Sequence, residues 1–141
     1  MDTKDLAIAW LKQDEGLVLH PYKCTADKTS IGYGRNLEDC GINQDEADLM
    51  LQNDYQTARL DAISYLGTEG FTDLSETQRA VMVCMAFNLG LTRLRKFVKL
   101  KAALLEGDYE EANYQMLDSK WAKQVGARSH RLANFILVND R

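Results

Sequence analysis

Proline, histidine and cysteine are scarce in this chain, which has one proline, two histidines and three cysteines among its 141 residues. The three cysteines (Cys24, Cys40 and Cys84) are too few for a disulfide framework. Their spacings from one another and from the histidines match no zinc motif. We therefore expect no metal site and no cofactor.

Long hydrophobic runs are also missing. The longest, Ala80–Phe87, spans eight residues, whereas a helix that crosses a membrane needs about 18 or more. The first residues carry Asp2 and Asp5 among their apolar positions and do not resemble a secretory signal. These absences predict a protein made in the cytoplasm, with no membrane segment and no leader.

The remaining composition is typical of a globular protein. Hydrophobic residues make up 45% and charged residues 27% of the chain, so neither a disordered nor a fibrous protein is expected. The length fits a single domain that buries its own core. A monomer is the default expectation.

Charge is divided unevenly along the chain. The formal net charge is −4, yet residues 1–75 carry 14 acids against 6 bases, and residues 76–141 carry 7 acids against 11 bases. The bases of the second half include a cluster formed by Arg93, Arg95, Lys96, Lys99 and Lys101. Because the whole chain is acidic and has no nucleic-acid-binding motif, we interpret the cluster as a solvated helix face and expect no nucleic-acid partner.

Helical patterns dominate the sequence, and one short segment differs from them. Apolar spacing and capping residues predict helices over residues 3–14, 43–66, 77–89, 91–105, 109–117 and 128–138. Ser75 and Gln78 form a capping box before the third of these helices. Residues 16–37 instead contain short β-leaning runs separated by turn residues, which predicts a small antiparallel hairpin or meander. The expected fold class is α+β and mostly helical.

The predicted helix over residues 77–89 is apolar on every side, which is typical of a helix in the middle of a core. We expect the side chains of Cys84 and Phe87 to be buried there. Trp10 and Trp121 are expected to fill cores rather than to stack on a ligand.

Glu15 stands at the predicted end of the first helix. The carboxyl end of a helix carries a partial negative charge, which disfavours a second negative charge nearby. The neighbouring Leu17 and Leu19 are expected to shield the side chain from water. A carboxyl group kept protonated in this way is what a general acid requires, although a glutamate at a helix end is more often an ordinary surface residue.

The residues after Glu15 follow a specific spacing. Eight residues separate Glu15 from Cys24, five separate Cys24 from Ser30, and an Ile-Gly-Tyr-Gly turn with Gly32 and Gly34 follows. This pattern resembles the catalytic segment of the phage-type lysozymes, a family of glycoside hydrolases. That family has Glu, eight residues, Asp or Cys, five residues, Thr, and then an Ile-Gly-x-Gly turn.

Later segments resemble the same family in the same order. They are Gly41-Ile42-Asn43, Phe87-Asn88-Leu89-Gly90, Ser119-Lys120-Trp121, Arg128 and Arg131. The resemblance implies a lysozyme-like fold with a small β-containing lobe over about residues 15–42 and an interlobe helix over about 43–66. The helical lobe would comprise about 67–141 together with the helix over 3–14.

The resemblance also implies an activity, namely cleavage of the β-1,4 bond between N-acetylmuramic acid and N-acetylglucosamine in bacterial peptidoglycan. Glu15 would protonate the departing glycosidic oxygen, and Cys24 would occupy the place of the second catalytic residue. Ser30 stands where the family has a threonine that helps to hold the attacking water.

Four further residues are expected to support this site. Gly32 and Gly34 would let the sugar chain approach the backbone, or they serve only the tight turn. Asn88 is expected to line the substrate cleft. Arg128 matches a C-terminal arginine of the family that packs near the catalytic glutamate, and we expect it to anchor that carboxylate.

Three positions depart from the family pattern. Cys24 replaces the usual carboxylate, and a free thiol with a pKa of about 8.5 is only slightly ionised at pH 7. Its role as base, nucleophile or wall that positions water stays open, as does the inverting or retaining outcome, and Asp27 is the nearest spare carboxylate. Ser30 lacks the methyl group of threonine, and Arg35 stands where the family usually has histidine.

The leading hypothesis is a phage endolysin that lyses its bacterial host. A separate membrane-permeabilising, holin-like protein would admit it to the wall, without direct contact. Two alternatives remain: a lytic transglycosylase on the same fold, for which Cys24 would be incidental, and a silent lysozyme-like domain that binds glycan. A Cys24–Cys40 disulfide formed after release would disable Cys24.

Overall fold

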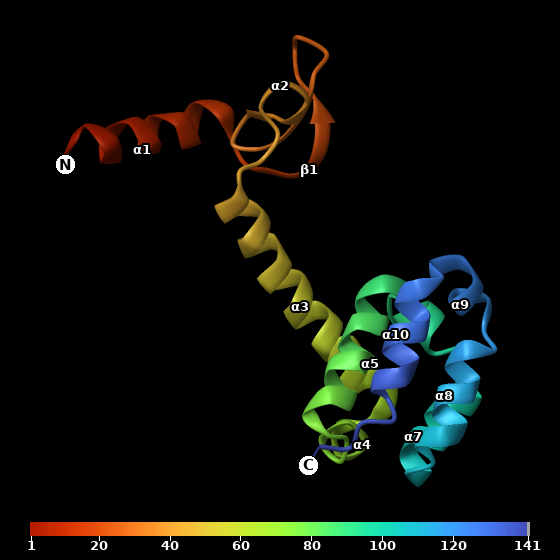
Figure 1. Ribbon diagram of the computed structural model, residues 1–141. Helices are drawn as coiled ribbons and strands as arrows, with labels where there is room; N and C mark the ends of the chain where they lie inside the picture. The colour runs from red at the N-terminus through yellow and green to blue at the C-terminus, as the bar shows by residue number, and fades with distance from the viewer. Residues whose placement is uncertain (141) are drawn as a thin grey trace. The chain divides into compact units, whose positions relative to one another are not determined.

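The structure is a computed structural model that describes residues 1–140. The chain divides into two compact units, Met1–Leu49 (unit 1) and a larger one from Met50 onward (unit 2). The long helix α3 (Gln44–Leu66) begins in unit 1 and continues in unit 2 (Figure 1). This division assigns the first helix to unit 1. The lobe boundaries expected from the family resemblance stay a prediction.

Unit 1 contains a helix, a small sheet and a short second helix before α3. Its elements are α1 (Thr3–Glu15), β1 (Val18–Lys23), β2 (Thr29–Gly32), β3 (Arg35–Asn36) and α2 (Leu37–Cys40). The predicted first helix and the predicted β segment are both confirmed, whereas the one-turn helix α2 was not predicted.

Both ends of α1 are set by local signals. The side chain of Asp2 caps the first turn by accepting a hydrogen bond from the backbone N–H of Asp5, at 2.9 Å. At the other end Gly16 has a φ of 69° and donates its N–H to the carbonyl of Lys12. The helix therefore stops directly after Glu15, and this places the Glu15 side chain at the start of the sheet.

The sheet is antiparallel with the order β1-β2-β3. Val18 pairs with Gly32 and Tyr22 with Ser30, with an irregularity between the two pairs in β1. Ser30 also pairs with Asn36 of β3, so it occupies the middle strand. Ser30 is the one residue of unit 1 that is fully buried among those the structure describes.

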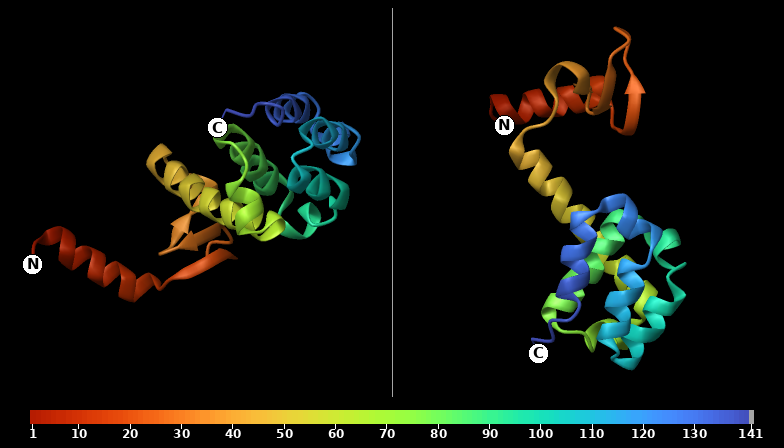
Figure 2. Two further views of the ribbon diagram at one scale, coloured as in Figure 1. Left: turned by 90° about the horizontal axis from the view of Figure 1, so that it is seen from below. Right: turned by 45° about the vertical axis from the view of Figure 1, so that its right-hand side comes forward.

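Unit 2 is helical and carries the hydrophobic core. After α3 its helices are α4 (Thr68–Thr72), α5 (Glu76–Leu89), α6 (Leu91–Leu94), α7 (Val98–Glu106), α8 (Tyr109–Leu117), α9 (Lys120–Val125) and α10 (Ala127–Phe135). α10 packs against α5, α8 and α9, and α8 packs against α7 (Figures 1 and 2). Of the helices that the structure describes, none is long and apolar enough to span a membrane.

The central helix α5 is buried on one side only, which corrects one expectation. Met82 and Met85 are fully buried, but Cys84 is exposed and Phe87 is 54% exposed. Cys84 and Phe87 are three residues apart and share one stripe of the helix. The apolar run therefore supplies both a core face and a second apolar face outside the core of unit 2. Both tryptophans were expected to fill cores. Trp121 is buried, but Trp10 is 60% exposed, so the expectation is wrong for Trp10.

The helix predicted over residues 91–105 is broken into α6 and α7. Leu94 and Leu100 are both fully buried, yet six residues in a continuous helix turn through about 600°, which would place them on different faces. The break between the two helices lets both side chains enter the core. It is stabilised by the Tyr65 hydroxyl, which donates a hydrogen bond to the carbonyl of Phe97.

The N-terminus of α5 is tied to the end of the chain. The predicted capping box is confirmed, because Ser75 and Gln78 exchange hydrogen bonds between side chain and backbone. The same two side chains also donate to the carbonyls of Val138 and Ile136. The helix predicted over residues 128–138 ends earlier, at Phe135, and the following residues are fixed by these contacts.

Candidate active site

Glu15 lines a pocket that lies entirely in unit 1. The pocket has a volume of about 370 Å³, and its walls are formed by Ile8, Leu11, Lys12, Glu15, Tyr33 and Gly34. The Lys12 ammonium lies 5.5 Å from the centre of the Tyr33 ring, so a cation over an aromatic face forms part of the wall of the pocket that Glu15 lines. The shield expected from Leu17 and Leu19 is wrong, because these side chains are 53% and 71% exposed.

The turn between β2 and β3 brings Gly34 directly against Glu15. A Cβ atom added at Gly34 would lie 2.7 Å from Glu15 Oε2, which is closer than real Cβ contacts. Gly32 has the same φ of 73°, but a Cβ there would meet open space. Gly34 therefore leaves room for the Glu15 carboxyl group by lacking a side chain, whereas a side chain at Gly32 would meet no other protein atom.

Cys24 and Ser30 come together at the other end of the hairpin. Cys24 follows β1, and its backbone N–H donates to the carbonyl of Lys28 at 2.9 Å. The Ser30 hydroxyl donates to the same carbonyl at 3.2 Å. The predicted spacing thus places the two side chains around one turn, with Ser30 buried beneath it.

The surroundings of the Cys24 sulfur favour its ionised form. The pKa of the Cys24 thiol is lowered, first by the backbone N–H groups of Lys28 and Ala26 and then by the Ser30 hydroxyl, against an opposing effect of burial. Hydrogen bonds to sulfur are stronger when it carries a charge, so they stabilise the thiolate. The thiol is accordingly better suited to acid–base chemistry than a free cysteine in water.

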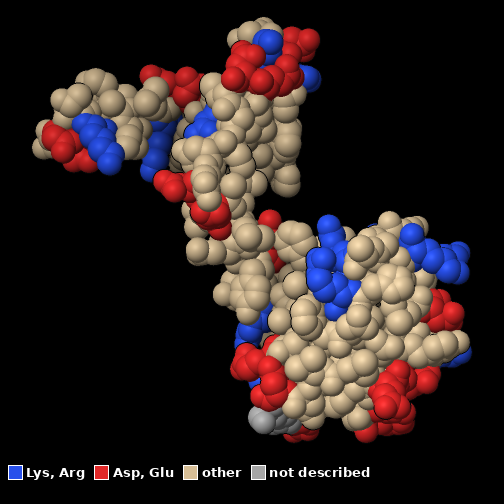
Figure 3. Space-filling model, in the orientation of Figure 1, with Lys and Arg blue, Asp and Glu red and all other residues tan. Residues whose placement is uncertain are grey.

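Charged side chains of both signs fix the hairpin to α2. Lys23 pairs with Glu38 at 3.1 Å, and Lys28 pairs with Asp39 at 3.4 Å. Figure 3 shows red and blue side chains lying together at this end of unit 1.

Arg35, at the position where the family has histidine, is engaged in an ion pair. Its guanidinium binds the Glu46 carboxylate in bidentate fashion, at 2.6 and 2.9 Å, and also donates to the carbonyl of Gly41. The pKa of Glu46 is lowered, chiefly by Arg35. Arg35 therefore joins β3 to the start of α3 rather than facing the Glu15 pocket.

Asn88 and Arg128 belong to unit 2. The side-chain oxygen of Asn88 accepts a hydrogen bond from the indole N–H of Trp121, at 2.8 Å. Asn88 and Arg128 both line a pocket of about 420 Å³, together with Phe87 and Arg131. The structure thus brings Asn88 near Arg128, Glu15 near Gly34, and Cys24 near Ser30.

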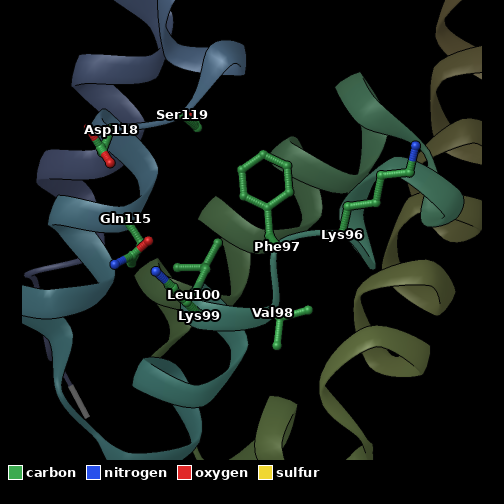
Figure 4. A pocket seen from close by; sticks show the side chains of 8 residues that line it. All are labelled: Lys96, Phe97, Val98, Lys99, Leu100, Gln115, Asp118 and Ser119. Carbon is green, nitrogen blue, oxygen red and sulfur yellow. The ribbon is translucent and has the colours of Figure 1, made fainter.

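A different pocket of unit 2 contains two residues of the basic cluster. It measures about 360 Å³, and Phe97 and Leu100 project into it (Figure 4). Gln115, Asp118 and Ser119 lie across from the Phe97 ring, and the ammonium of Lys96 points away from them (Figure 4). This pocket is lined by a single carboxylate, that of Asp118, and by no cysteine.

No cluster of three or more His, Cys, Asp or Glu side chains that could bind a metal ion occurs in the part of the chain that the structure describes. The sequence-predicted side chains of unit 1 are a carboxyl group (Glu15), a thiol (Cys24) and a hydroxyl (Ser30), carried by one small sheet and the helix before it.

A family model described as phage lysozyme matches residues 12–135 of this chain. The chain belongs to the phage lysozyme family. The matched range includes α1 from Lys12 onward, the whole sheet and the helices of unit 2 as far as Phe135. The resemblance found in the sequence is thus confirmed at the level of the family.

Two relatives extend the comparison. An endolysin of Acyrthosiphon pisum secondary endosymbiont phage 1 is 31% identical over 127 residues, which cover 87% of this chain and 82% of that protein. The pre-baseplate central spike protein Gp5 of Enterobacteria phage T4 is 25% identical over an alignment of 166 positions, gaps included, which covers 99% of this chain and 29% of that protein. These relatives therefore include a protein about the size of this chain and a much longer one.

The sequence analysis missed three residues that shape the site. Lys12 precedes Glu15 by three residues and so shares its helix face, a spacing that identifies it in retrospect. Tyr33 lies between the two glycines of the turn. Glu38 had no sequence signal of its own, because its contacts depend on the unpredicted helix α2.

Proposed function

We propose that this protein is an endolysin, a glycosidase that cleaves the β-1,4 bond between N-acetylmuramic acid and N-acetylglucosamine in bacterial peptidoglycan. Membership of the phage lysozyme family and similarity to a protein named endolysin support a wall-lysing glycosidase. The observation that carries the finer proposal is the Glu15 carboxyl group, which lines a pocket of unit 1 and lies against Gly34.

In the proposed reaction Glu15 acts as the general acid. Its proton passes to the glycosidic oxygen as the bond to the anomeric carbon breaks, so the leaving sugar departs as an alcohol. Cys24, as the thiolate, takes a proton from the water that attacks the anomeric carbon, and Ser30 helps to hold that water. The lowered pKa of Cys24 supports this assignment.

The remaining site residues have supporting roles in the proposal. Gly32 and Gly34 allow the glycan to approach the turn closely. Asn88 lines the substrate cleft, and Arg128 anchors the catalytic carboxylate, both on the strength of the family resemblance.

The proposal also covers the biological setting. The substrate is the peptidoglycan of a bacterial host, which the protein reaches as a monomer from the host cytoplasm. A separate holin-like protein permeabilises the membrane and so gives access to the wall.

The first test is the variant Glu15→Gln, with Asp14→Asn as the matched control on the same exposed end of α1. Loss of a general acid lowers the rate by at least about 100-fold, so Glu15→Gln should release almost no fragments from Gram-negative peptidoglycan. Both variants should keep the melting temperature of the parent. Equal rates for the two variants would show that Glu15 is not the general acid.

Mass spectrometry of the released fragments tests the reaction itself. Reducing N-acetylmuramic acid ends are expected for hydrolysis. Anhydro ends, lighter by one water, would instead identify a transglycosylase, and no release by a folded protein would identify a glycan-binding domain.

The role of Cys24 is tested by two substitutions. Cys24→Asp restores the carboxylate usual in the family and should keep or raise the rate, whereas Cys24→Ala should lose about 100-fold or more. An inverted anomeric configuration in the first product is expected if the thiolate activates water, and a retained one would make Cys24 a nucleophile. Full activity of Cys24→Ala would exclude either role.

A further inference from the structure

The turn that carries Cys24 is closed by its own backbone. The N–H of Cys24 donates to the carbonyl of Lys28 at 2.9 Å, and the N–H of Asp27 donates to the carbonyl of Cys24 at 2.8 Å. Asp27 adopts a left-handed conformation with a φ of 60°, which aspartate tolerates better than most residues. These two hydrogen bonds hold the turn residues between the strands in one conformation, in which the backbone N–H groups of Lys28 and Ala26 lower the pKa of the Cys24 thiol.

One side chain from outside the sheet binds both stems of this turn. Glu38 Oε1, on α2, accepts a hydrogen bond from the backbone N–H of Thr29 at 2.9 Å and another from Lys23 Nζ at 3.1 Å. Lys23 Nζ also donates to the Thr29 hydroxyl at 3.0 Å. Lys23 and Thr29 are cross-strand partners, one directly before Cys24 and the other directly after Lys28. A single carboxylate oxygen therefore joins the two ends of the turn to each other and to α2.

We propose that Glu38 is a positioning residue for Cys24: by binding the two stems of the β1–β2 turn it fixes the backbone N–H groups of Ala26 and Lys28 beside the sulfur. The inference rests on the proposed function, in which Cys24 is the second catalytic group. Glu38 itself does not touch the reacting atoms in this proposal. It acts through the geometry of the turn.

The contacts of the Glu38 carboxylate differ from those of an ordinary surface ion pair, which contributes little to the stability of the fold. The pKa of Glu38 is lowered to about 2, and the largest cause is the backbone N–H of Thr29, with Lys23 contributing less. The carboxylate is therefore ionised at every pH at which a wall hydrolase is assayed, and its main partner is part of the hairpin backbone.

The effect of Glu38 on the turn geometry can be distinguished from the effect of its charge, because several charged groups surround the turn. They are Lys23, Asp27 and Lys28 on the hairpin, and Glu38 and Asp39 on α2. Removing the negative charge of Glu38, and so freeing Lys23, would by charge alone favour the thiolate. Loosening the turn has the opposite effect, because the N–H groups then leave the sulfur. The two explanations predict opposite directions.

The experiment measures the ionisation of Cys24 directly. Cys40 and Cys84 are exposed and are replaced by serine in the full-length protein, so that Cys24 is the one thiol. The rate of alkylation by iodoacetamide is followed from pH 5 to 10, and circular dichroism verifies that each variant is folded. The variants are Glu38→Ala, Glu38→Gln, and Asp39→Asn as the matched control, because Asp39 binds the same turn only through the side chain of a lysine.

In the expected result Glu38→Ala raises the midpoint of the alkylation profile by about half a pH unit or more. Glu38→Gln keeps an acceptor for the backbone N–H, so it should show a smaller rise and also covers the case in which Glu38→Ala does not fold. Asp39→Asn should leave the midpoint unchanged. An unchanged or lowered midpoint in both Glu38 variants would overturn the proposal.

Lytic activity distinguishes this inference from the proposed function. If Glu38→Ala raises the midpoint and also lowers turnover, while Cys24→Ala is inactive, both proposals are supported. If the midpoint rises but Cys24→Ala is as active as the parent, Glu38 positions the thiol as inferred and the catalytic role of Cys24 is wrong.

Discussion

At the scale of single residues, the site depends on the absence of a side chain as much as on the presence of one. Gly32 and Gly34 have the same φ of 73°, so any other residue is strained at either position. Only at Gly34 does a Cβ atom also collide with the Glu15 carboxyl group, at 2.7 Å. Substitutions at the two glycines can therefore be compared directly, because the backbone strain is the same at both positions and only the effect on the Glu15 carboxyl group differs.

We predict that Gly34→Ala lowers the rate of peptidoglycan cleavage at least about 10-fold, since a displacement of reacting groups by about 1 Å has effects of this size. Gly32→Ala is the control for the backbone strain and for the approach of the glycan, and it should lose less activity than Gly34→Ala, because a Cβ at Gly32 does not meet Glu15. Both variants should lose about 1–2 kcal/mol of stability from the left-handed backbone. Rates are compared on purified peptidoglycan, and unfolding is followed by circular dichroism. Equal losses of activity in the two variants would show that the contact with Glu15 has no influence.

At the scale of elements, the N-terminus of α5 connects the central helix to the end of the chain. Gln78 is completely buried, its amide oxygen accepts from the backbone of Ser75, and its amide nitrogen donates to the carbonyl of Ile136. A buried donor or acceptor left without a partner costs about 1–3 kcal/mol. One side chain thus satisfies two backbone groups from segments far apart in the sequence.

We predict that Gln78→Ala lowers the free energy of unfolding by about 2–4 kcal/mol, because it leaves both backbone groups unsatisfied and removes half of the capping box. The matched control is Gln115→Ala, since Gln115 also makes a side-chain hydrogen bond within a helix, to Glu111, but in a more exposed place. That variant should change stability by less than about 0.5 kcal/mol. Urea denaturation of both variants gives the comparison, and similar losses would contradict the role of burial.

The helices and the site were predictable from the sequence to different degrees, for physical reasons. The capping box before α5 depends on residues three apart, and such local signals are visible in the sequence. The break between α6 and α7 depends on Leu94 and Leu100 entering the same core, which only the packing decides. In the site, the spacing placed Cys24 beside Ser30 because both belong to one hairpin. The contacts of Glu38 require the folded position of α2, and so the sequence alone did not indicate them.

At the scale of the whole molecule, hydrophobic burial is distributed very unevenly between the two units. Every residue of the hydrophobic core cluster lies at or after Ala58, whereas Ser30 is the one buried residue among those of unit 1 that the structure describes. The catalytic candidates Glu15 and Cys24 therefore belong to the unit with less buried apolar surface. Regions with few buried apolar contacts open at a lower free energy than the core does.

We predict that native-state hydrogen exchange separates the two units in the full-length protein. Backbone amides of α5, in the core of unit 2, should exchange only through global unfolding, whereas those of β1 and β2 should exchange several kcal/mol more easily. Low concentrations of urea should then leave α5 protected while the sheet signals change first in NMR spectra. Glu38→Ala should weaken protection in the sheet and leave α5 unaffected, because its contacts are confined to the hairpin. Equal protection of sheet and α5 would instead mean that unit 1 unfolds only together with the core of unit 2, so that its stability does not follow its own buried surface.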